Sequence, residues 1–259
     1  MTTIGVLHPG DMGAAIGASL RNRGFAVLWA STGRGASTTR RAADAGLQDA
    51  GTLARLCTES DVVLSICPPH AAVEVAKSVA AQGFSGVYVD ANAISPATAA
   101  EVAALVATAE YVDGGVIGPL PTESSPSRLY LSGERAGELA GILGGGPLEA
   151  IAIDGGPTAA SALKMTYAAW TKGTAAMLLA VRETAAANGV LDPLLAEWSR
   201  SQPALAGRLA GAQRSAATKG WRWTGEMREI AATFQNAGQP AGFHQAAAAI
   251  YESYDRPAD

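Results

Sequence analysis

The chain has few of the residues that build metal sites, disulfide frameworks or membrane spans. Its 259 residues include three histidines and two cysteines, Cys57 and Cys67. Two cysteines cannot form a disulfide framework, and no Cys/His cluster has the spacing of metal ligands, so we expect reduced thiols and no metal. No stretch approaches the roughly 18 uninterrupted apolar residues of a spanning helix, and a secretion signal is missing. These features predict a cytoplasmic protein.

Charge is also scarce, and positive charge is the scarcer sign. Charged residues make up 16% of the chain, with 19 Lys and Arg against 23 Asp and Glu, a formal net charge of -4. That sign gives no general attraction to a phosphodiester backbone, which argues against nucleic acid as a partner. Hydrophobic residues make up 48% of the chain, as in an ordinary soluble globular protein.

Short apolar runs alternate with helical patterns over residues 1–156. This alternation is typical of a doubly wound parallel sheet covered by helices on both faces, the Rossmann type of α/β fold. After Asp154-Gly155-Gly156-Pro157 the pattern becomes entirely helical. We therefore predict a dinucleotide-binding Rossmann domain over 1–156, followed by an all-helical substrate and dimerisation domain over 157–259. The predicted strands are 3–7, 25–30, 61–67, 86–90, 111–117, 129–132 and 148–153, and the predicted C-terminal helices include 158–188, one capped by Asp192-Pro193, and one opening at Pro203, with interruptions at Gly220, Gly225 and 236–240.

The segment His8-Pro9-Gly10-Asp11-Met12-Gly13 stands between the first predicted strand and the first predicted helix. Dinucleotide-binding folds need glycine here, because the turn is tight and the helix N-terminus must present its N–H groups to a pyrophosphate. Gly10 and Gly13 match the second and third glycines of G-x-G-x-x-G, whereas His8 takes the first position. The flanking strand and helix favour a cofactor site at Gly10, Asp11, Met12 and Gly13.

The end of the second predicted strand indicates which dinucleotide is bound. In NAD enzymes an acidic residue there takes the ribose 2'-hydroxyl, but residues 29–34 contain none and Arg40-Arg41 follow. Hydroxyls at Ser31 and Thr32 and a guanidinium at Arg34 suit a 2'-phosphate. We predict NADP, with NAD as the other possibility; the alternative is that the arginines belong to a solvated helix start.

The long helical segment that begins at Thr158 is apolar on nearly every side and is predicted to be buried all round. Its only formal charges up to Val181 are Lys164 and Lys172. Burial makes an amine easier to deprotonate, which a general acid or base needs near neutral pH, whereas a lysine that extends its amine to solvent has no such role. Ser161 and Lys164 also spell S-x-x-K, but the companion motifs of serine acyl-transfer enzymes are absent.

Five segments in order give the chain its resemblance to the superfamily of 3-hydroxyacid dehydrogenase and 6-phosphogluconate dehydrogenase. They are Gly10-Asp11-Met12-Gly13, Ile66-Cys67-Pro68-Pro69, Asp90 to Pro96, Asp113 to Pro119, and Lys164, which falls on the catalytic lysine of the family. Lys172 is not part of that pattern. The C-terminal segment resembles a shorter bacterial branch whose helical domain is poorly characterised.

The resemblance implies hydride transfer between a nicotinamide cofactor and a small alcohol or ketone. Lys164 would then be the general acid and base, and Cys67, Pro68 and Asn92 would lie beside the cofactor. The residues expected on the substrate side are Asn92, Gly118 and Pro119, together with Trp221, Trp223 and His244 unless those three only pack the helical domain.

Two departures from the family pattern bear on the substrate. Ile117 replaces a serine that binds a substrate carboxylate, and Ala168 replaces an asparagine one turn after the lysine. The expected substrate is therefore less polar than the usual 3-hydroxy acid. An imine reductase and a non-catalytic NADP-binding sensor are the alternatives. Because one sheet domain cannot cover so much apolar helix, we also expect a homodimer.

Overall fold

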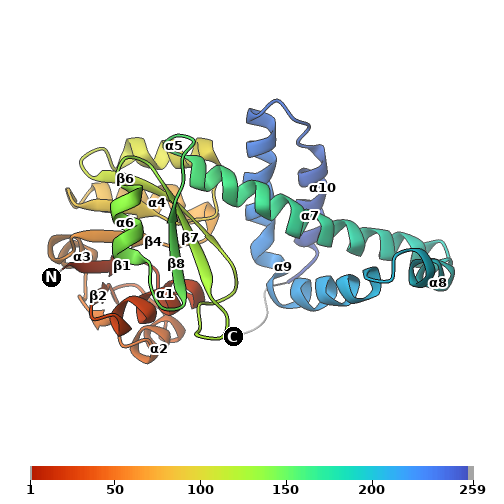
Figure 1. The fold of residues 1–259 in the computed structure, drawn as a ribbon, viewed down its shortest axis with the longest axis horizontal. Coiled ribbons are helices and arrows are strands. Elements are labelled where there is room, and N and C mark those ends of the chain that lie inside the picture. The colour runs from red at the N-terminus through yellow and green to blue at the C-terminus, as the bar shows by residue number, and fades with distance from the viewer. Residues whose placement is uncertain (1, 256–259) are drawn as a thin grey trace. The chain divides into compact units, whose positions relative to one another are not determined.

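The computed structural model describes residues 2–255. One eight-stranded sheet has the order β3-β2-β1-β4-β5-β6-β7-β8 (Figure 1). The predicted Rossmann domain is confirmed, followed by a helical C-terminal region. The strands are β1 (Thr3–Val6), β2 (Ala26–Trp29), β3 (Gln48–Asp49), β4 (Val62–Ser65), β5 (Val87–Asp90), β6 (Glu110–Ile117), β7 (Ser127–Ser132) and β8 (Leu148–Ala152).

The sequence predicted a parallel sheet, and the sheet is parallel except for one antiparallel pair. The strands from β3 to β6 pair in parallel, β6 and β7 pair antiparallel, and β7 and β8 pair in parallel again. The reversal follows from chain length, because only residues 118–126 join β6 to β7. A parallel crossover needs a dozen or more residues.

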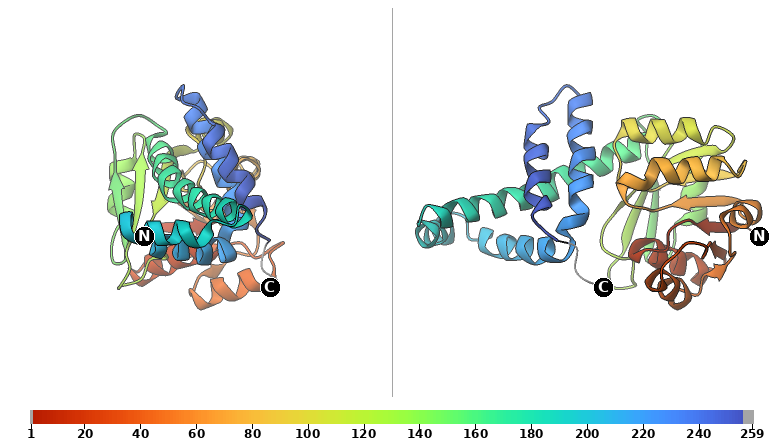
Figure 2. Two further views of the ribbon diagram at one scale, coloured as in Figure 1. Left: turned by 90° about the vertical axis from the view of Figure 1, so that its right-hand side faces the viewer. Right: turned by 180° about the vertical axis from the view of Figure 1, so that it is seen from behind.

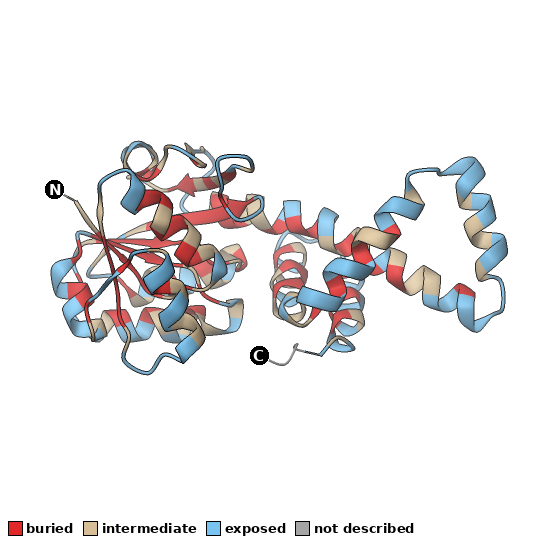
Figure 3. Ribbon diagram, turned by 90° about the horizontal axis from the view of Figure 1, so that it is seen from below, coloured by how far each residue is buried: buried red, intermediate tan, exposed pale blue. Residues whose placement is uncertain are grey.

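Helices cover both faces of the sheet. Successive side chains of each strand point to opposite faces, so a hydrophobic core forms on each side. One core packs β-strand residues such as Ile4 and Val6 against α1, α2 and α6; the other packs Leu28, Val63 and Tyr88 against α3, α4 and α5. The buried strands appear red in Figure 3. The helices are α1 (Asp11–Asn22), α2 (Ala36–Asp44), α3 (Leu53–Glu59), α4 (Ala72–Ala80) after a short 3-10 turn (Pro69–Ala71), α5 (Pro96–Leu105) and α6 (Ala136–Leu143).

The C-terminal region is helical, but it differs from expectation at Gly220, Gly225 and Asp192. The helices are α7 (Ala159–Ala187), α8 (Leu191–Ser201), α9 (Leu205–Asn236) and α10 (Gly242–Glu252), and α9 and α10 lie side by side (Figure 2). Gly220 and Gly225 do not interrupt α9, since about 1 kcal/mol per glycine is small against the packing of a 32-residue helix. Asp192 does not cap α8, which already begins at Leu191.

The prediction that α7 is buried all round is wrong. Tyr167, Trp170 and Met177 are 46%, 69% and 44% exposed. Their spacings of three and seven residues place them on one side of the helix. The opposite side carries buried residues such as Met165 and Ala176. One side of α7 is thus buried and the other is exposed, although the sequence of the helix is apolar almost throughout.

The chain divides into two compact units, one up to Lys164 and one from Met165. α7 runs through this division without a break. The domain boundary placed between residues 156 and 157 stays a prediction. Among the described residues, no helix is both long enough and apolar enough to cross a lipid bilayer.

Candidate functional site

The carboxyl ends of the parallel strands bring most of the predicted site residues in the first unit to one edge of the sheet. The loop of residues 7–13 follows β1, residues 30–34 follow β2, Cys67 and Pro68 follow β4, and Asn92 follows β5. The strand order reverses between β1 and β4, since β2 lies on one side of β1 and β4 on the other. In open α/β sheets, ligands bind at such a switch point.

The phosphate loop is closed by a backbone contact that requires glycine at position 13. The Gly10 N–H donates to the His8 carbonyl oxygen at 2.8 Å. A Cβ atom on Gly13 would stand 2.3 Å from the same oxygen, whereas a Cβ on Gly10 would meet nothing within 4 Å. No side chain caps the N-terminus of α1 at Gly10. The loop therefore leaves open space and uncapped helix N–H groups, an arrangement that suits an anionic phosphate.

His8 adds no positive charge to this loop. Burial, with a smaller contribution from the nearby Arg34 guanidinium, lowers the pKa of His8 to about 4. The imidazole is therefore neutral at physiological pH. Its Nδ1 atom is buried and has no hydrogen-bond partner among the described residues. His8 needs no left-handed backbone, because no non-glycine residue of the described chain has a positive φ.

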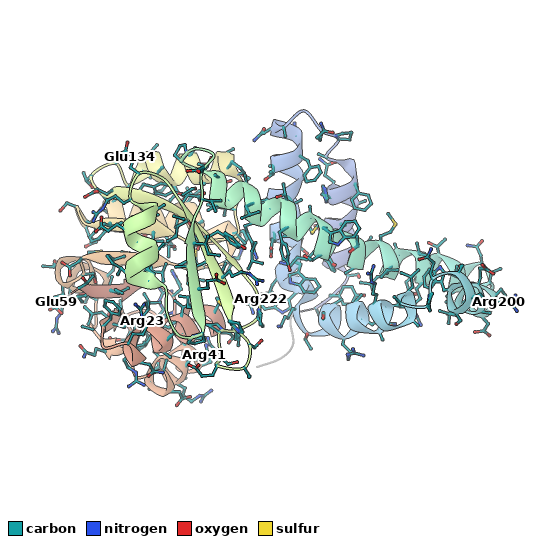
Figure 4. All side chains as sticks on the ribbon, in the orientation of Figure 1. Arg23, Arg41, Glu59, Glu134, Arg200 and Arg222 are labelled. Carbon is teal, nitrogen blue, oxygen red and sulfur yellow. The ribbon has the colours of Figure 1, made fainter. Side chains whose placement is uncertain are left out.

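Two arginines reach from the region after β2 to the phosphate loop. Arg34 Nη2 donates to the Leu7 carbonyl oxygen at 3.4 Å, and Arg41 Nε donates to the Pro9 carbonyl oxygen at 3.3 Å. Arg41, labelled in Figure 4, also lies 3.7 Å from the Asp11 carboxylate at the start of α1. Asp11 is the acidic group that would repel a phosphate here, and Arg41 offsets its charge.

Asp49, which the sequence analysis missed, shapes the loop that carries Ser31 and Thr32. Its Oδ1 accepts N–H groups from Ser31 at 3.2 Å and from Gly51 at 2.7 Å, and Thr32 Oγ1 donates to the Gly51 carbonyl at 2.7 Å. A hydrogen bond from Ser31 is the largest cause of the lowered pKa of Asp49. Asp49 was missed because β3 has only two residues, both exposed.

Asn92 joins the ends of β4 and β5 and is almost completely buried. Its Oδ1 accepts the Cys67 N–H at 2.6 Å, and its Nδ2 donates to Ser65 Oγ at 3.1 Å. Its own N–H donates to Asp90 Oδ1 at 3.0 Å. Burial raises the pKa of the Cys67 thiol to about 12, so the thiol stays protonated. The structure thus brings Asn92 and Cys67 together and gives the Asn92 side chain a structural task.

Two buried carboxyl groups lie in register on β5 and β6. Asp90 pairs with Asp113 across the two strands. Burial, together with the neighbouring Asp113 charge, raises the pKa of Asp90 to about 7. Burial also raises the pKa of Asp113 to about 6, against the opposing effect of hydrogen bonds from Ser161 and Ser132. Asp113 is therefore the carboxylate of the two that carries its charge more fully at neutral pH.

Asp113 fastens the start of α7 to the sheet. Its Oδ2 accepts the Ser161 N–H at 2.8 Å, and its Oδ1 accepts the Ser161 hydroxyl at 2.6 Å. Lys164 follows one turn later and is half-buried, where the sequence predicted an enclosed amine. A Cβ atom on Gly115 of β6 would stand 2.9 Å from the Lys164 Cβ. Lys164 is therefore packed on β6, the strand next to β5, which Asn92 follows.

Residues 117–119 turn the chain away from the end of β6. Gly118 has φ +132°, and the Ser127 hydroxyl donates to the Pro119 carbonyl oxygen. A Cβ on Gly118 would stand 3.1 Å from the Ser127 Cα, so this turn needs glycine. Ile117 is buried and apolar. Gly118 and Pro119 thus follow β6 at the same edge as Asn92.

Four residues that the sequence analysis discussed belong to the helical unit: Lys172, Trp221, Trp223 and His244. The Lys172 amine pairs with the Glu226 carboxylate and lies 5.5 Å from the ring centre of Trp223. His244 is 4% exposed and lies edge-on to Phe234 at 4.2 Å between ring centres. Trp221 is half-buried in α9. These contacts describe packing within the unit, and a role for Trp221, Trp223 or His244 toward a substrate stays a prediction.

A hollow of about 490 Å³ lies elsewhere in the first unit. It is lined by residues at the amino ends of the strands, such as Thr2, Gly86 and Glu110. The strand edge that carries the phosphate loop is the opposite one. Within residues 2–255, no group of three or more His, Cys, Asp or Glu side chains is placed to hold a metal ion.

Two family models match the chain. Residues 3–123 match the NAD binding domain of 6-phosphogluconate dehydrogenase, and residues 185–254 match a domain of unknown function, DUF1932. An uncharacterized 28.5 kDa protein from the 7S RNA 5' region of Methanothermus fervidus is 33% identical over 165 residues, which make up 63% of this chain and 63% of that protein. The alignment thus covers less than two thirds of the relative.

Solved structures share the fold over nearly the whole chain. A conserved protein of unknown function, described as structurally similar to 3-hydroxyacid dehydrogenases, is 24% identical with a TM-score of 0.72, over 96% of this chain and 95% of that one. The reductive aminase of Aspergillus terreus, in complex with NADPH, cyclohexanone and allyl amine, is 17% identical with a TM-score of 0.61, over 97% and 92%. At these identities the likeness shows the fold.

Proposed function

We propose, from the match of residues 3–123 to the NAD binding domain of 6-phosphogluconate dehydrogenase, that this chain transfers hydride between NADP and a small alcohol or its ketone. The observation that carries the proposal is the single strand edge shared by the phosphate loop, by Asn92 and by Lys164. In this proposal the phosphate loop binds the cofactor, and Lys164 transfers the proton of the substrate.

The phosphate loop fits a dinucleotide. Its uncapped helix N-terminus and the open space at Gly10 suit the pyrophosphate, and the contact at Gly13 explains the remaining glycine. We assign the 2'-phosphate of NADP to Arg34 with Ser31 and Thr32, because arginine offers a planar pair of donors to phosphate oxygens. When bound, the nicotinamide supplies the site that accepts or donates the hydride.

We assign to Lys164 the transfer of the proton that the substrate hydroxyl loses or gains. An alcohol loses a proton as it is oxidised, and a ketone gains one as it is reduced, so an amine that exchanges that proton serves both directions. Packing against Gly115 supports a fixed position for the lysine, close to the end of β6. Gly118 and Pro119 would border the substrate there. Asn92 would act mainly by holding the end of β4 in place, since its side chain already bonds to Cys67 and Ser65.

The substrate is expected to be less polar than a 3-hydroxy acid. Ile117 and Ala168, which occupy the two positions where the resemblance leads us to expect polar side chains, are 4% and 1% exposed and apolar. An apolar position cannot pair with a carboxylate, and a carboxylate left without a partner there loses affinity. A small ketone or secondary alcohol without a second charged group fits this composition.

The test is a cofactor-consumption screen of hydroxy acids, ketones and imines with NADPH and NADP⁺, followed by Lys164→Ala on each active compound. We expect turnover of a ketone or alcohol to fall about 100-fold or more, the range of lost acid–base catalysis, while the Kd for NADPH changes less than about twofold. Lys172→Ala is the matched control on the same helix. Full turnover by Lys164→Ala would refute the assignment of the proton.

An imine reductase is the second candidate. The apolar side chains at Ile117 and Ala168 favour it, because a cyclic imine offers no carboxylate to bind. Reduction of imines without any ketone activity would select this candidate. A sensor that binds NADP without catalysis would show NADPH binding and no turnover in the whole screen. The three outcomes are thus separated by one set of measurements.

We further propose that the protein is a homodimer, and its location in the cytoplasm likewise stays a prediction. The support for a dimer is the exposed side of α7, where Tyr167, Trp170 and Met177 follow one another along the helix. Large apolar side chains gathered on one face of a helix favour association with another surface. A second copy is the occupant we propose for it.

A further inference from the structure

The start of α7 is tied to the sheet by one carboxylate. Asp113 accepts both the N–H and the hydroxyl of Ser161, at 2.8 and 2.6 Å. It also accepts the Ser132 hydroxyl at 3.1 Å, and the Ser132 oxygen in turn accepts the Ala160 N–H at 3.0 Å. All four residues are completely or almost completely buried. Two successive N–H groups of the first helical turn are thus held, one directly and one through Ser132.

The N–H groups of the first turn of a helix have no partners within the helix, and helix ends commonly fray. Here a buried negative charge faces the positive end of the α7 dipole, which is a favourable interaction. The strands that carry Asp113 and Ser132 pair with each other directly, at the register Asp113 to Ser132. The helix start is therefore fixed to the antiparallel pair of β6 and β7.

Lys164 lies three residues after Ser161, so it stands one turn along the same helix. Its backbone is pressed on β6, where a Cβ on Gly115 would stand 2.9 Å from the Lys164 Cβ and 2.8 Å from the Ala160 carbonyl oxygen. Asp113 and Gly115 are two residues apart on β6 and share one face of the strand. The carboxylate and the glycine thus set the height and the rotation of the helix at the lysine.

We propose that Asp113 is a positioning residue for Lys164: the carboxylate holds the first turn of α7, and through that turn it fixes where the lysine amine stands. The inference rests on the proposed function, in which Lys164 handles the proton. The segment Asp113 to Pro119 resembles a family segment that holds substrate, whereas in this chain the Asp113 side chain is turned to Ser161 and Ser132. Its effect on the reaction is therefore indirect.

The test compares the chemical reactivity of the four lysines of the chain in whole protein saturated with NADPH. A short pulse of acetic anhydride is followed by peptide mass spectrometry. Lys77, an exposed residue paired with Glu74, is the internal reference, and Lys172 reports on α7 two turns beyond Lys164. The variants are Asp113→Ala, Asp113→Asn and Ser161→Ala. Ser19→Ala, which removes a buried hydroxyl from α1, is the matched control.

We expect Asp113→Ala to change the acetylation rate of Lys164 relative to Lys77 by about fivefold or more, because a freed helix start opens locally. Ser161→Ala keeps the N–H contact to Asp113, so a change of about twofold to threefold is expected. Asp113→Asn should restore a rate near the original, since an amide oxygen accepts the Ser161 N–H and an amide nitrogen donates to the Ser161 hydroxyl. Lys172 should keep its rate in every variant.

Three results would overturn the inference. One is an unchanged Lys164 rate in both Asp113→Ala and Ser161→Ala. The second is an equal change at Lys172, which would mean that Asp113 only supports the fold. The third is a failure of Asp113→Asn to recover; should Asp113→Ala not fold, Ser161→Ala and Asp113→Asn decide the question.

Turnover separates this inference from the proposed function. With a substrate from the cofactor-consumption screen, Asp113→Ala should lower kcat and leave the Kd for NADPH within about twofold, and it should have no further effect in a Lys164→Ala background. Additive losses would show that Asp113 acts apart from Lys164 and would overturn the inference. Full turnover by Lys164→Ala would overturn the proposed function while the acetylation rates still report on the contact.

Discussion

Replacing Gly13 by alanine tests the cofactor site through the backbone of the phosphate loop. The added Cβ would lie 2.3 Å from the His8 carbonyl oxygen, and ordinary contact requires a separation more than 1 Å larger. That oxygen accepts the Gly10 N–H, so the loop must move as a whole. Overpacking of this kind costs about 1–3 kcal/mol, against about 1 kcal/mol gained by replacing a helical glycine with alanine.

The loop displacement should be more visible in binding than in stability. We expect the net loss in the free energy of unfolding to stay below about 2 kcal/mol, because the two terms oppose each other. The Kd for NADPH should rise at least about tenfold, which corresponds to about 1.4 kcal/mol of lost binding free energy. Chemical denaturation of the free protein and titration of NADPH fluorescence measure the two quantities.

Gly17→Ala is the matched control, since it makes the same substitution one turn later in α1. Its Cβ would stand 2.9 Å from the Leu47 Cδ2, the end of a side chain that can turn aside, and not from the backbone of the loop. We expect an unchanged Kd for NADPH in this variant. If Gly13→Ala binds NADPH as the unaltered protein does, or if both variants lose affinity equally, the assignment of the loop to the cofactor is wrong.

Three further predictions concern charge, pH and assembly. Arg34→Ala should weaken NADPH about 10- to 100-fold and leave NADH almost unchanged, as fluorescence titration with both cofactors will decide; equal losses would remove the 2'-phosphate assignment. Because the pKa of Asp90 is raised to about 7, its contribution to the free energy of unfolding is complete below about pH 4 and declines as the pH rises through 7, by about 1.4 kcal/mol per pKa unit. Asp90→Asn should lack that decline in denaturant titrations from pH 4 to 8. Parallel curves of unfolding free energy against pH for the variant and the unaltered protein would contradict this prediction. Light scattering should give about twice 26.2 kDa for the unaltered chain and the single mass for Trp170→Glu, whereas a monomeric unaltered protein rules out the dimer.

Most of the fold was predictable because it is written in local patterns. The strand at residues 62–65 is a continuous buried run, and Ser95, directly before Pro96, caps α5 through a hydrogen bond from the Thr98 N–H. β3 and α3 were not predicted. β3 consists of Gln48 and Asp49, which carry no apolar signal, and it is a strand only because β2 lies beside it. Pairing of this kind has no local signature in the sequence.

The site was predictable in part, for a related reason. The glycine spacing predicted the loop after β1 and the family resemblance pointed to Cys67, and both lie at one edge because parallel strands bring their carboxyl ends together whatever their order. Contacts that depend on register were beyond the sequence. The pairing of Asp90 with Asp113 and the reach of Asp49 to Ser31 join residues 23 and 18 positions apart, and neither spacing belongs to a motif.

Ser161 and Lys164 have a spacing that is compatible with two roles for the serine, as an activated nucleophile or as an anchor for the helix. In S-x-x-K the hydroxyl and the amine stand one helical turn apart, and that separation alone suits an activated nucleophile. The hydroxyl of Ser161 instead donates to Asp113 and is 1% exposed, so it is closed to any substrate. What decides between the two is the strand beneath the helix, because Asp113 and Gly115 face α7 from alternate positions of β6. The serine fixes the helix to the sheet, which leaves the S-x-x-K spacing without an available nucleophile, and the proposed proton transfer needs only the amine of Lys164.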